Sequence, residues 1–393
     1  MAEKIVKIHN KSDKPDNIIK KEYDIDQKCK MLEKELPPYL ARFHAYLRGS
    51  VLPMTRLAYL YDLRFFFQYI ISERPDLTSA KEPCKILLEE LEKIQSADIN
   101  TYIDYCRSYE VENDATIYVH ENANKTLARK KSSVSVMFKQ LYRDGILKKN
   151  ITDGFNPIRV QKPGEREIKR LEEDEVMRML DAVSSGMPLT EKERAFWEKT
   201  KKRDKAILML FLTYGLRISE LQQLNVSSFH FSRGEFKIYR KRGKESIMPL
   251  NQSVTMVILD YLNHERLPEE RIEEEHQDAL FLSLQGKRMT ERAIREMCKK
   301  YTSIGMNTSR SAGYSPHKLR ATAATSLIGR GNSIFDVQAL LDHEQVTTTQ
   351  LYAAHNQDVK RNLVRGMEWE LERQEGIKPE KPKSEGKSEE SNE

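Results

Sequence analysis

Six side chains in the second half of the sequence could together bind and attack a phosphodiester. They lie in four short segments and are Arg217, Lys241, His317, Arg320, His343 and Tyr352. Arginine presents a planar fork that matches two phosphate oxygens. Two arginines with histidine donors can therefore stabilise the charge of an in-line displacement without a metal ion. A tyrosine, with an ordinary pKa of about 10, becomes a nucleophile when cations lower that pKa or a neighbouring base takes its proton.

Local signals position the first two of these residues. A glycine ends an apolar helix in Thr213-Tyr-Gly-Leu-Arg, and Arg217 opens the next helix. Lys241 lies in a turn between two short strands, where a lysine can reach into a groove and protonate a leaving oxygen. Lys244 in the same turn is a close competitor for that role. The simpler interpretations are a surface Arg217 paired with Glu220 and a solvated turn lysine.

The other two segments are helical. His317 and Arg320 are three residues apart, so they share a helix face near its N-terminus, where the helix dipole favours an anion. His343 comes nine residues before Tyr352, across a Thr-rich segment in which a helix is expected to begin at Thr347 or Thr348. The simpler interpretations are that His317 caps a helix, that Arg320 lies on the surface and that Tyr352 belongs to the core. The order and spacing of the whole set must therefore decide between these interpretations and a catalytic site.

The ordered set resembles the active-site signature of the tyrosine recombinases, which include phage and transposon integrases and Xer-type resolvases. The segments that carry the resemblance are "TYGLRISEL", "KRGKESIMPL", "HKLRATAATSL" and "LLDHEQVTTTQLYAAH". It extends over roughly residues 36–367. One departure is Asp342, where many members have glycine; it leaves His343 in place but puts the shape of that turn in question.

This resemblance implies a mechanism and a partner. Tyr352 would attack the scissile phosphate to give a 3′-phosphotyrosyl link and a free 5′-hydroxyl, with Lys241 as the general acid. Because the covalent link conserves the bond energy, no cofactor is expected, in agreement with the absence of a G-x-x-x-x-G-K-[ST] loop from the sequence. A homotetramer would assemble on two double-stranded DNA sites and exchange strands through a Holliday junction, with room for an accessory factor.

Apolar periodicity predicts an all-helical first unit. Helices are expected from Thr55, as the N-cap, to about residue 70, over 97–110, and over 125–143. The candidates for DNA contact are Thr55, Arg56, Lys125, Arg129, Lys130, Lys131 and, from the second unit, Lys244. A solvated helix face is the simpler interpretation of the lysine cluster.

The second unit is predicted to be mixed. Helices are expected over 172–182 and 204–214, and strands over 235–239 and 246–250 form the only hairpin that the sequence indicates. The expected fold class is mainly α with a small β-sheet (α+β). The resemblance makes the first unit a core-type, SAM-like DNA-binding domain, makes the second the catalytic domain, and implies a clamp around DNA.

The expected division of the chain follows composition. It consists of a flexible arm or short helix (1–33), the helical domain (34–150), a linker (151–167), the catalytic domain (168–369) and a disordered charged tail (370–393). A segment around 363–371 resembles the C-terminal helix that family members dock onto a neighbouring subunit.

Composition limits the class of protein. The 393 residues are 39% hydrophobic and 32% charged, and the net charge is +6, with −3 in the last 24 residues and +9 in the rest. No apolar run approaches the roughly 18 residues of a membrane helix, so we expect neither a membrane protein nor a secreted one. Four scattered cysteines indicate neither disulfides nor a zinc site, which favours a reduced cytoplasmic protein. A basic body favours a polyanionic partner.

Several functions stay in competition. The favoured one is a recombinase or integrase of a mobile element, because Xer-type dimer resolvases, the alternative, are usually shorter. A type IB topoisomerase would share the chemistry but work as a monomer. A non-catalytic DNA-binding regulator should have lost some of the six residues. A metal-dependent nuclease would need an acidic cluster, and the densest run, Glu269, Glu270, Glu273, Glu274 and Glu275, is better interpreted as a solvated loop.

Overall fold

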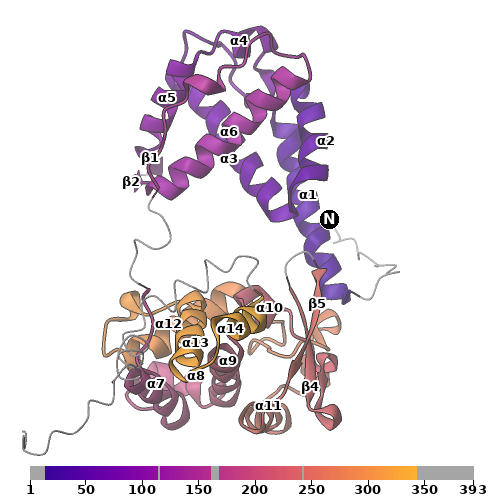
Figure 1. Cartoon of the computed structure of the whole chain (residues 1–393), viewed down its shortest axis with the longest axis vertical. Helices are drawn as coiled ribbons and strands as arrows, with labels where there is room; N and C mark the ends of the chain where they lie inside the picture. Colours follow the sequence, from indigo (N-terminus) through magenta and orange to yellow (C-terminus); the bar gives the residue numbers. More distant parts are fainter. Residues whose placement is uncertain (1–13, 114–115, 161–167, 241–242, 343–393) are drawn as a thin grey trace, which may run out of the picture. The chain divides into compact units, whose positions relative to one another are not determined.

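The computed structural model describes residues 14–113, 116–160, 168–240 and 243–342 (Figure 1). Over these ranges the chain is mainly helical with two small antiparallel sheets, which confirms the predicted fold class. By its internal contacts the chain divides into two compact units, 1–323 and 324–393, so the division falls inside one helix, α13 (Pro316–Gly329). In the described part, no helix is both long enough and apolar enough to span a membrane.

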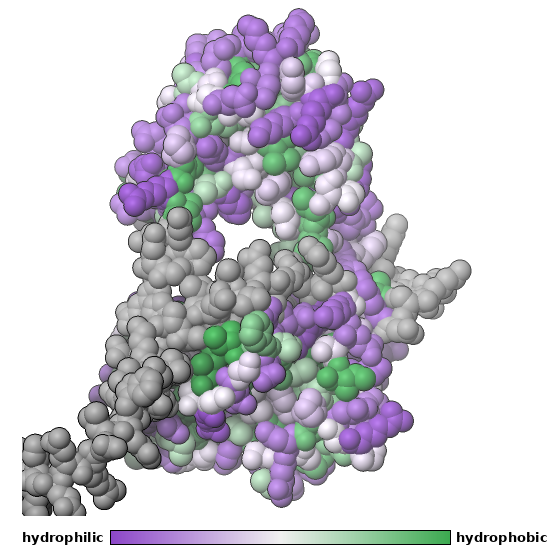
Figure 2. Space-filling view, in the orientation of Figure 1, coloured by the Kyte–Doolittle hydropathy of each residue, from purple (hydrophilic) through white to green (hydrophobic). Residues whose placement is uncertain are grey.

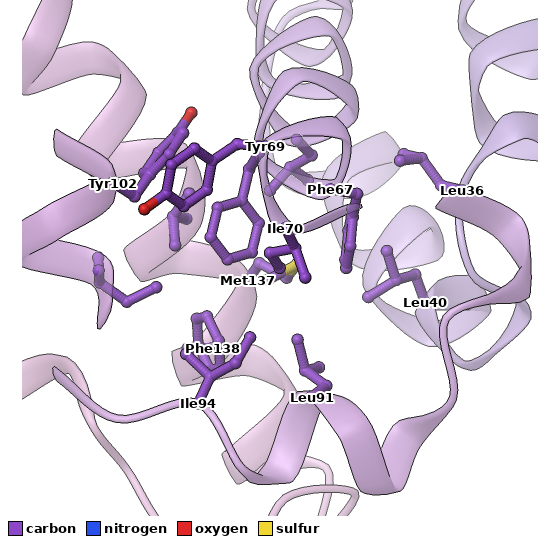
Figure 3. Packing of buried hydrophobic residues seen from close by; sticks show 14 of the residues in the cluster. Leu36, Leu40, Phe67, Tyr69, Ile70, Leu91, Ile94, Tyr102, Met137 and Phe138 are labelled. Atoms are coloured by element: carbon purple, nitrogen blue, oxygen red, sulfur yellow. The ribbon is translucent and has the colours of Figure 1, made fainter. Parts of the chain in front are cut away.

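The N-terminal part is a helical bundle with its own apolar core. Its helices are α1 (Asp16–Glu35), α2 (Ala41–Ser50), α3 (Pro53–Glu73), α4 (Leu88–Glu92), α5 (Ser96–Tyr105) and α6 (Asn124–Arg143). Figure 3 shows Phe67 and Ile70 of α3 meeting Met137 and Phe138 of α6 in this core. All buried members of the cluster lie between Cys29 and Phe155. Helix α6 begins one residue before the predicted start and ends at the predicted Arg143.

Helix α1 supports the helical alternative for residues 16–33 and excludes a flexible arm there, although the helix is 20 residues long rather than short. Its Cys29 and Leu32 are buried in the core, and Ile25 packs against that core. These positions, followed by Leu36, repeat at helical spacing within an otherwise charged segment. The many charged residues of the segment conceal this apolar stripe, which is long enough to pack the helix against the core.

A hairpin corrects the expectation that the predicted helical domain, residues 34–150, contains only helices. Strands β1 (Ser108–Asn113) and β2 (Thr116–Glu121) pair antiparallel between α5 and α6. Helix α5 therefore ends at Tyr105 rather than at Glu110. Because every residue of β2 is exposed, no buried face marks this strand in the sequence. The hairpin predicted from the strands 235–239 and 246–250 is consequently not the only one in the chain.

The start of α3 also differs from the prediction. The helix begins at Pro53, with Leu52 as its N-cap, so Thr55 lies in the first turn and is not the cap. Proline suits this position because its fixed φ is helical and its missing N–H has no partner to lose there. Thr55 is exposed.

The C-terminal part combines helices with a small sheet. Its elements are α7 (Glu173–Ser185), α8 (Glu191–Trp197), α9 (Lys201–Tyr214), α10 (Ile218–Gln222), β3 (Phe229–His230), β4 (Glu235–Tyr239), β5 (Glu245–Pro249), α11 (Gln252–His264), α12 (Glu291–Gly305), α13 and α14 (Ile334–Leu341). Helix α9 packs against α7 and α11, and α7 packs against α12. The sheet order is β3-β4-β5, so the predicted hairpin gains a third, two-residue strand.

Several predictions concern segments outside the described residues. They include the second half of the linker, the helix expected near Thr347 or Thr348, the segment 363–371 and the charged tail. The predicted domain boundaries therefore stay predictions.

Candidate active site

The turn that follows α9 positions Arg217. Gly215 ends the helix with a left-handed φ of 56°, a conformation that costs glycine little. Arg217 is then the N-cap of α10, and its backbone N–H donates to Glu220 Oε2 at 2.8 Å. Its Nη1 donates to Glu220 Oε1 at 2.6 Å. Since the Glu220 side chain is only 2% exposed, this carboxylate fixes both the backbone and the guanidinium of Arg217.

Arg320 reaches the same turn from helix α13. Its Nη1 donates to the carbonyl oxygen of Gly215 at 2.6 Å, and the residue is 3% exposed. Gly215 is only two residues before Arg217. The structure thus brings together two of the predicted arginines, which lie more than 100 residues apart in the sequence.

The end of the β4–β5 hairpin lies next to Glu220, the carboxylate that pairs with Arg217. Arg240 Nη1 is 4.0 Å from Glu220 Oε1, and both side chains are 2% exposed. The Arg240 N–H donates to the Lys244 carbonyl at 2.8 Å, which closes the turn. Lys241 follows Arg240 directly in the sequence but lies outside the described residues. Glu220 therefore joins Arg217 to the residue that precedes the predicted general acid.

His317 occupies the first turn of α13. Its side chain is exposed, yet the protein around the ring partly desolvates it, and Lys318 and Arg320 are nearby. Desolvation and these cations lower the pKa of His317 below its ordinary value. The imidazole is therefore mainly neutral near pH 7, so that one ring nitrogen donates and the other accepts.

The remaining predicted catalytic residues, Lys241, His343 and Tyr352, lie outside the described residues. Immediately before His343, Asp342 has a φ of 50° at the end of α14. This left-handed conformation accounts physically for a glycine at the corresponding position of many family members, and aspartate is among the few other residues that tolerate it.

The candidates for DNA contact differ in how accessible they are. Lys130 is 7% exposed, and its ammonium lies 3.7 Å from Asp62 and 3.8 Å from the centre of the Phe65 ring. Arg56 is likewise buried and is paired with Asp26. Both side chains hold helices together inside the bundle, so we propose no contact with DNA for either of them.

Two further candidates have protein partners at the surface. Arg129 is exposed and ion-paired with Asp62, and Lys131 donates to the carbonyl of Asn156 at 2.6 Å. Thr55, Lys125 and Lys244 also have exposed side chains. Their accessibility suits contact with DNA.

Two positioning residues were missed as functional by the sequence interpretation. Glu220 appears there only as a surface partner, although a glutamate three residues after an N-cap is the spacing of a capping box. Arg240 carries a weaker signal, because strand alternation places it on the same face as the buried Phe236 and Ile238. The structure shows that both are buried at the site.

The acidic run predicted to be solvated contains one cluster with a cation-compatible arrangement. Ligand atoms of Glu273, Glu275 and His276 lie within 4.8 Å of one another. However, Glu273 is paired with Lys287 at 2.9 Å, and Glu275 is paired with Lys20. Ion pairing within the protein accounts for this cluster, and we assign no metal to it.

Comparisons with known proteins identify the family. Residues 169–358, which include all six predicted catalytic positions, match the phage integrase family. The chain is 31% identical over 234 residues to the tyrosine recombinase XerC of Pelotomaculum thermopropionicum, covering 58% of this chain and 70% of that protein. It is 30% identical over 322 residues to XerC of Caldanaerobacter subterraneus subsp. tengcongensis, covering 80% and 82%. The chain belongs to the tyrosine recombinase family, a class of site-specific recombinases.

Solved structures agree at the level of the fold. A XerH site-specific recombinase bound to palindromic difH substrate has a TM-score of 0.56 at 14% identity, covering 87% of this chain and 93% of that one. A lambda integrase tetramer bound to a Holliday junction has a TM-score of 0.53 at 16% identity, covering 85% and 78%. At these identities the likeness concerns the fold alone.

Proposed function

We propose that this protein cuts and rejoins double-stranded DNA at specific sites through a 3′-phosphotyrosyl link to Tyr352. The observation that carries the proposal is the meeting of Arg217 and Arg320 at one turn, where Gly215 and Glu220 hold them. A guanidinium held in advance needs little reorganisation when charge develops on a phosphate, which is the property that electrostatic catalysis requires. Family membership supplies the nucleophile that the geometry leaves unassigned.

The proposed roles follow from the chemistry of each side chain. Arg217 and Arg320 would bind the nonbridging oxygens of the scissile phosphate, with His317 and His343 as hydrogen-bonding partners. Tyr352 would lose its phenolic proton and form the P–O bond while the bond to the 5′ oxygen breaks. Lys241 would give that oxygen its proton. Rejoining reverses these steps. A different 5′-hydroxyl attacks the phosphotyrosyl phosphorus and gives its proton to Lys241, while the bond to Tyr352 breaks and its phenol regains a proton.

Assembly and DNA contact form part of the same proposal. We infer that a homotetramer works on two DNA sites, a state consistent with the lambda integrase tetramer among the structures of like fold. The accessible candidates Thr55, Lys125 and Lys244 would contact the DNA, together with Arg129 and Lys131 if their present partners are exchanged for phosphate. An accessory factor remains part of the hypothesis.

The biological role has two candidates. Integration and excision of a mobile element fits the match to the phage integrase family. Resolution of chromosome or plasmid dimers is favoured by a specific observation, since both relatives described above are named XerC. A recombination assay separates the two roles, because only the first requires two dissimilar sites, one on the element and one on its target.

The experiment is a search for the covalent adduct. The purified protein is incubated in EDTA with nicked duplexes that carry the ends of its own genomic neighbourhood, and a denaturing gel resolves protein-linked DNA. We expect an adduct with the natural protein and none with Tyr352→Phe. Tyr142→Phe, which changes an exposed tyrosine on α6, is the matched control and should form the adduct normally.

One result would contradict the proposal. If the protein binds the DNA but forms no adduct on several candidate sites, including suicide substrates in which the cleaved fragment diffuses away, the chain is a DNA-binding regulator that retains the fold. An adduct that survives in Tyr352→Phe would move the nucleophile to another residue.

A further inference from the structure

The β1–β2 hairpin exposes an apolar surface. All residues of β2 are exposed, and its Ile117, Tyr118 and Val119 are 60%, 51% and 61% exposed. Most of the surface over α1–α6 that Figure 2 shows is hydrophilic. Adjacent exposed aliphatic and aromatic side chains on a two-stranded sheet are unfavourable in water unless another surface covers them.

The hairpin is firmly attached at its base. The Tyr109 ring lies 5.0 Å from the Phe65 ring of α3 and stacks on His120 across the hairpin at 5.3 Å. Beyond β2, the Asn122 side chain donates to the Cys106 carbonyl at 2.8 Å. These contacts fix the base of the strands to the bundle, so the exposed part is presented in a defined orientation.

One face of the hairpin combines apolar and acidic groups. Val119 pairs with Glu110 and Ile117 pairs with Glu112, so these four side chains share a face. Residues 108–121 contain four acidic residues and neither lysine nor arginine, a net charge of −4. Phosphates would repel this surface, and two such hairpins would repel each other. The complementary partner is therefore a protein surface with basic and apolar groups.

A second copy of this chain has the required charge. Outside residues 108–121 the chain carries a net charge of +10. Strand β2 leads through two residues into α6, whose exposed Lys125 is a proposed DNA contact. A hairpin at this end of α6 would lie beside the duplex, where a neighbouring copy on the same DNA would be within reach.

We propose that the hairpin 108–121 docks onto a basic surface of a second copy of this chain bound beside it on the same DNA. The inference rests on the proposed function, because DNA brings the copies together. Docking would bury Ile117 and Val119 and place Glu110 and Glu112 against cations of the neighbour. Its measurable consequence is cooperative binding of adjacent copies.

The experiment compares two duplexes of arbitrary sequence. One, of about one and a half helical turns, accommodates a single copy, and the other, about three times longer, accommodates neighbours. We expect the double variant Ile117→Ser/Val119→Ser to keep its affinity for the short duplex within about twofold, since both residues are exposed. Cooperativity on the long duplex should fall by about tenfold, the loss expected for a small apolar contact.

Two further variants sharpen the test. Met177→Ser removes an exposed apolar side chain from α7 and should leave both affinities unchanged. Glu110→Lys/Glu112→Lys should also reduce cooperativity, although it adds positive charge that favours DNA. Unchanged cooperativity in both hairpin variants overturns the inference, and so does weaker binding of the Ser variant to the short duplex, which would place the hairpin on DNA. If the natural protein binds neither these duplexes nor a duplex that carries the ends of its own genomic neighbourhood, the proposed function fails as well.

Discussion

The carboxylate of Glu220 connects two arginines with different tasks. Arg217 is a proposed phosphate ligand, whereas Arg240 precedes the proposed general acid in the sequence. Glu220 Oε1 accepts a hydrogen bond from Arg217 and lies 4.0 Å from Arg240 Nη1. Because the side chains of Glu220 and Arg240 are buried while Arg217 is partly exposed, the attraction between Glu220 and Arg240 is stronger than that of a surface ion pair. We infer that Glu220 and Arg240 position the Lys241 turn relative to the phosphate site.

Substitution of Arg240 should separate chemistry from DNA binding. We expect Arg240→Met to slow adduct formation in a single turnover by about tenfold, because Lys241 is held less well while Arg217 keeps its carboxylate partner. The affinity for the same DNA should change by less than about twofold, since Arg240 faces Glu220 and has no proposed contact with phosphate. Arg240→Lys should recover part of the rate. Equal loss of affinity and rate, or a large drop in unfolding temperature, would indicate a general structural role instead.

Asp342 makes a second prediction at the scale of one residue. Its φ of 50° is costly for a residue with an ordinary Cβ and cheap for glycine. We expect Asp342→Gly to be more stable than Asp342→Ala by about 0.5–1 kcal/mol, after allowance for the larger entropy of glycine in the unfolded chain. Urea denaturation of the two variants measures the difference. Equal stabilities would mean that the end of α14 does not keep this backbone conformation in solution.

At the scale of elements, burial decides what the sequence can predict. The apolar run of α9 and the glycine that ends it specified both the helix and the position of Arg217. Arg217, His317 and Arg320 could be recognised as candidate site residues because each lies beside a strong helix signal. Strand β2 could not, since none of its residues is buried, although its β-branched and aromatic composition is a signal of extended structure.

The same reasoning applies to helices and buried cations. Charge concealed the length and the packing of helix α1, yet Ile25, Cys29 and Leu32 follow a helical repeat. The lysine cluster at the start of α6 was predicted to face outward as a group. Lys130 instead points inward, because Asp62 and the Phe65 ring compensate for its burial. Such a partner comes from another helix, and sequence spacing along α6 does not reveal it.

For the whole molecule, the opposite charges of two adjoining elements fit the proposed DNA-bound assembly. Basic residues gather at the start of α6, where Lys125 and Arg129 are exposed, while the adjoining hairpin is acidic. Opposite charges on neighbouring elements allow one to face DNA and the other to face protein. Salt should therefore weaken both contacts, and the two-duplex comparison separates them.

Stability of the molecule should depend on pH through His44. This residue of α2 is 6% exposed, and burial together with Arg48 and Arg56 lowers its pKa to about 4. The unfolded chain, with an ordinary pKa near 6.5, takes up a proton that the folded state excludes, so stability falls as the pH drops below about 6.5. Between pH 7.5 and 5 the expected loss in unfolding free energy from this group is about 2 kcal/mol.

The window from pH 7.5 to 5 separates histidine effects from those of carboxylates whose pKa is lowered. Carboxylates whose pKa is lowered by an ion pair, such as Asp174 beside Arg178, lose their contribution only at lower pH, below about 4. His276 and His317 also have lowered pKa values, so the natural protein alone does not identify the group. Urea denaturation at both pH values should show His44→Gln losing about 2 kcal/mol less than the natural protein. If both lose the same free energy, His44 is protonated or hydrated in the folded state, and the tight core around α2 and α3 opens to water at mildly acidic pH.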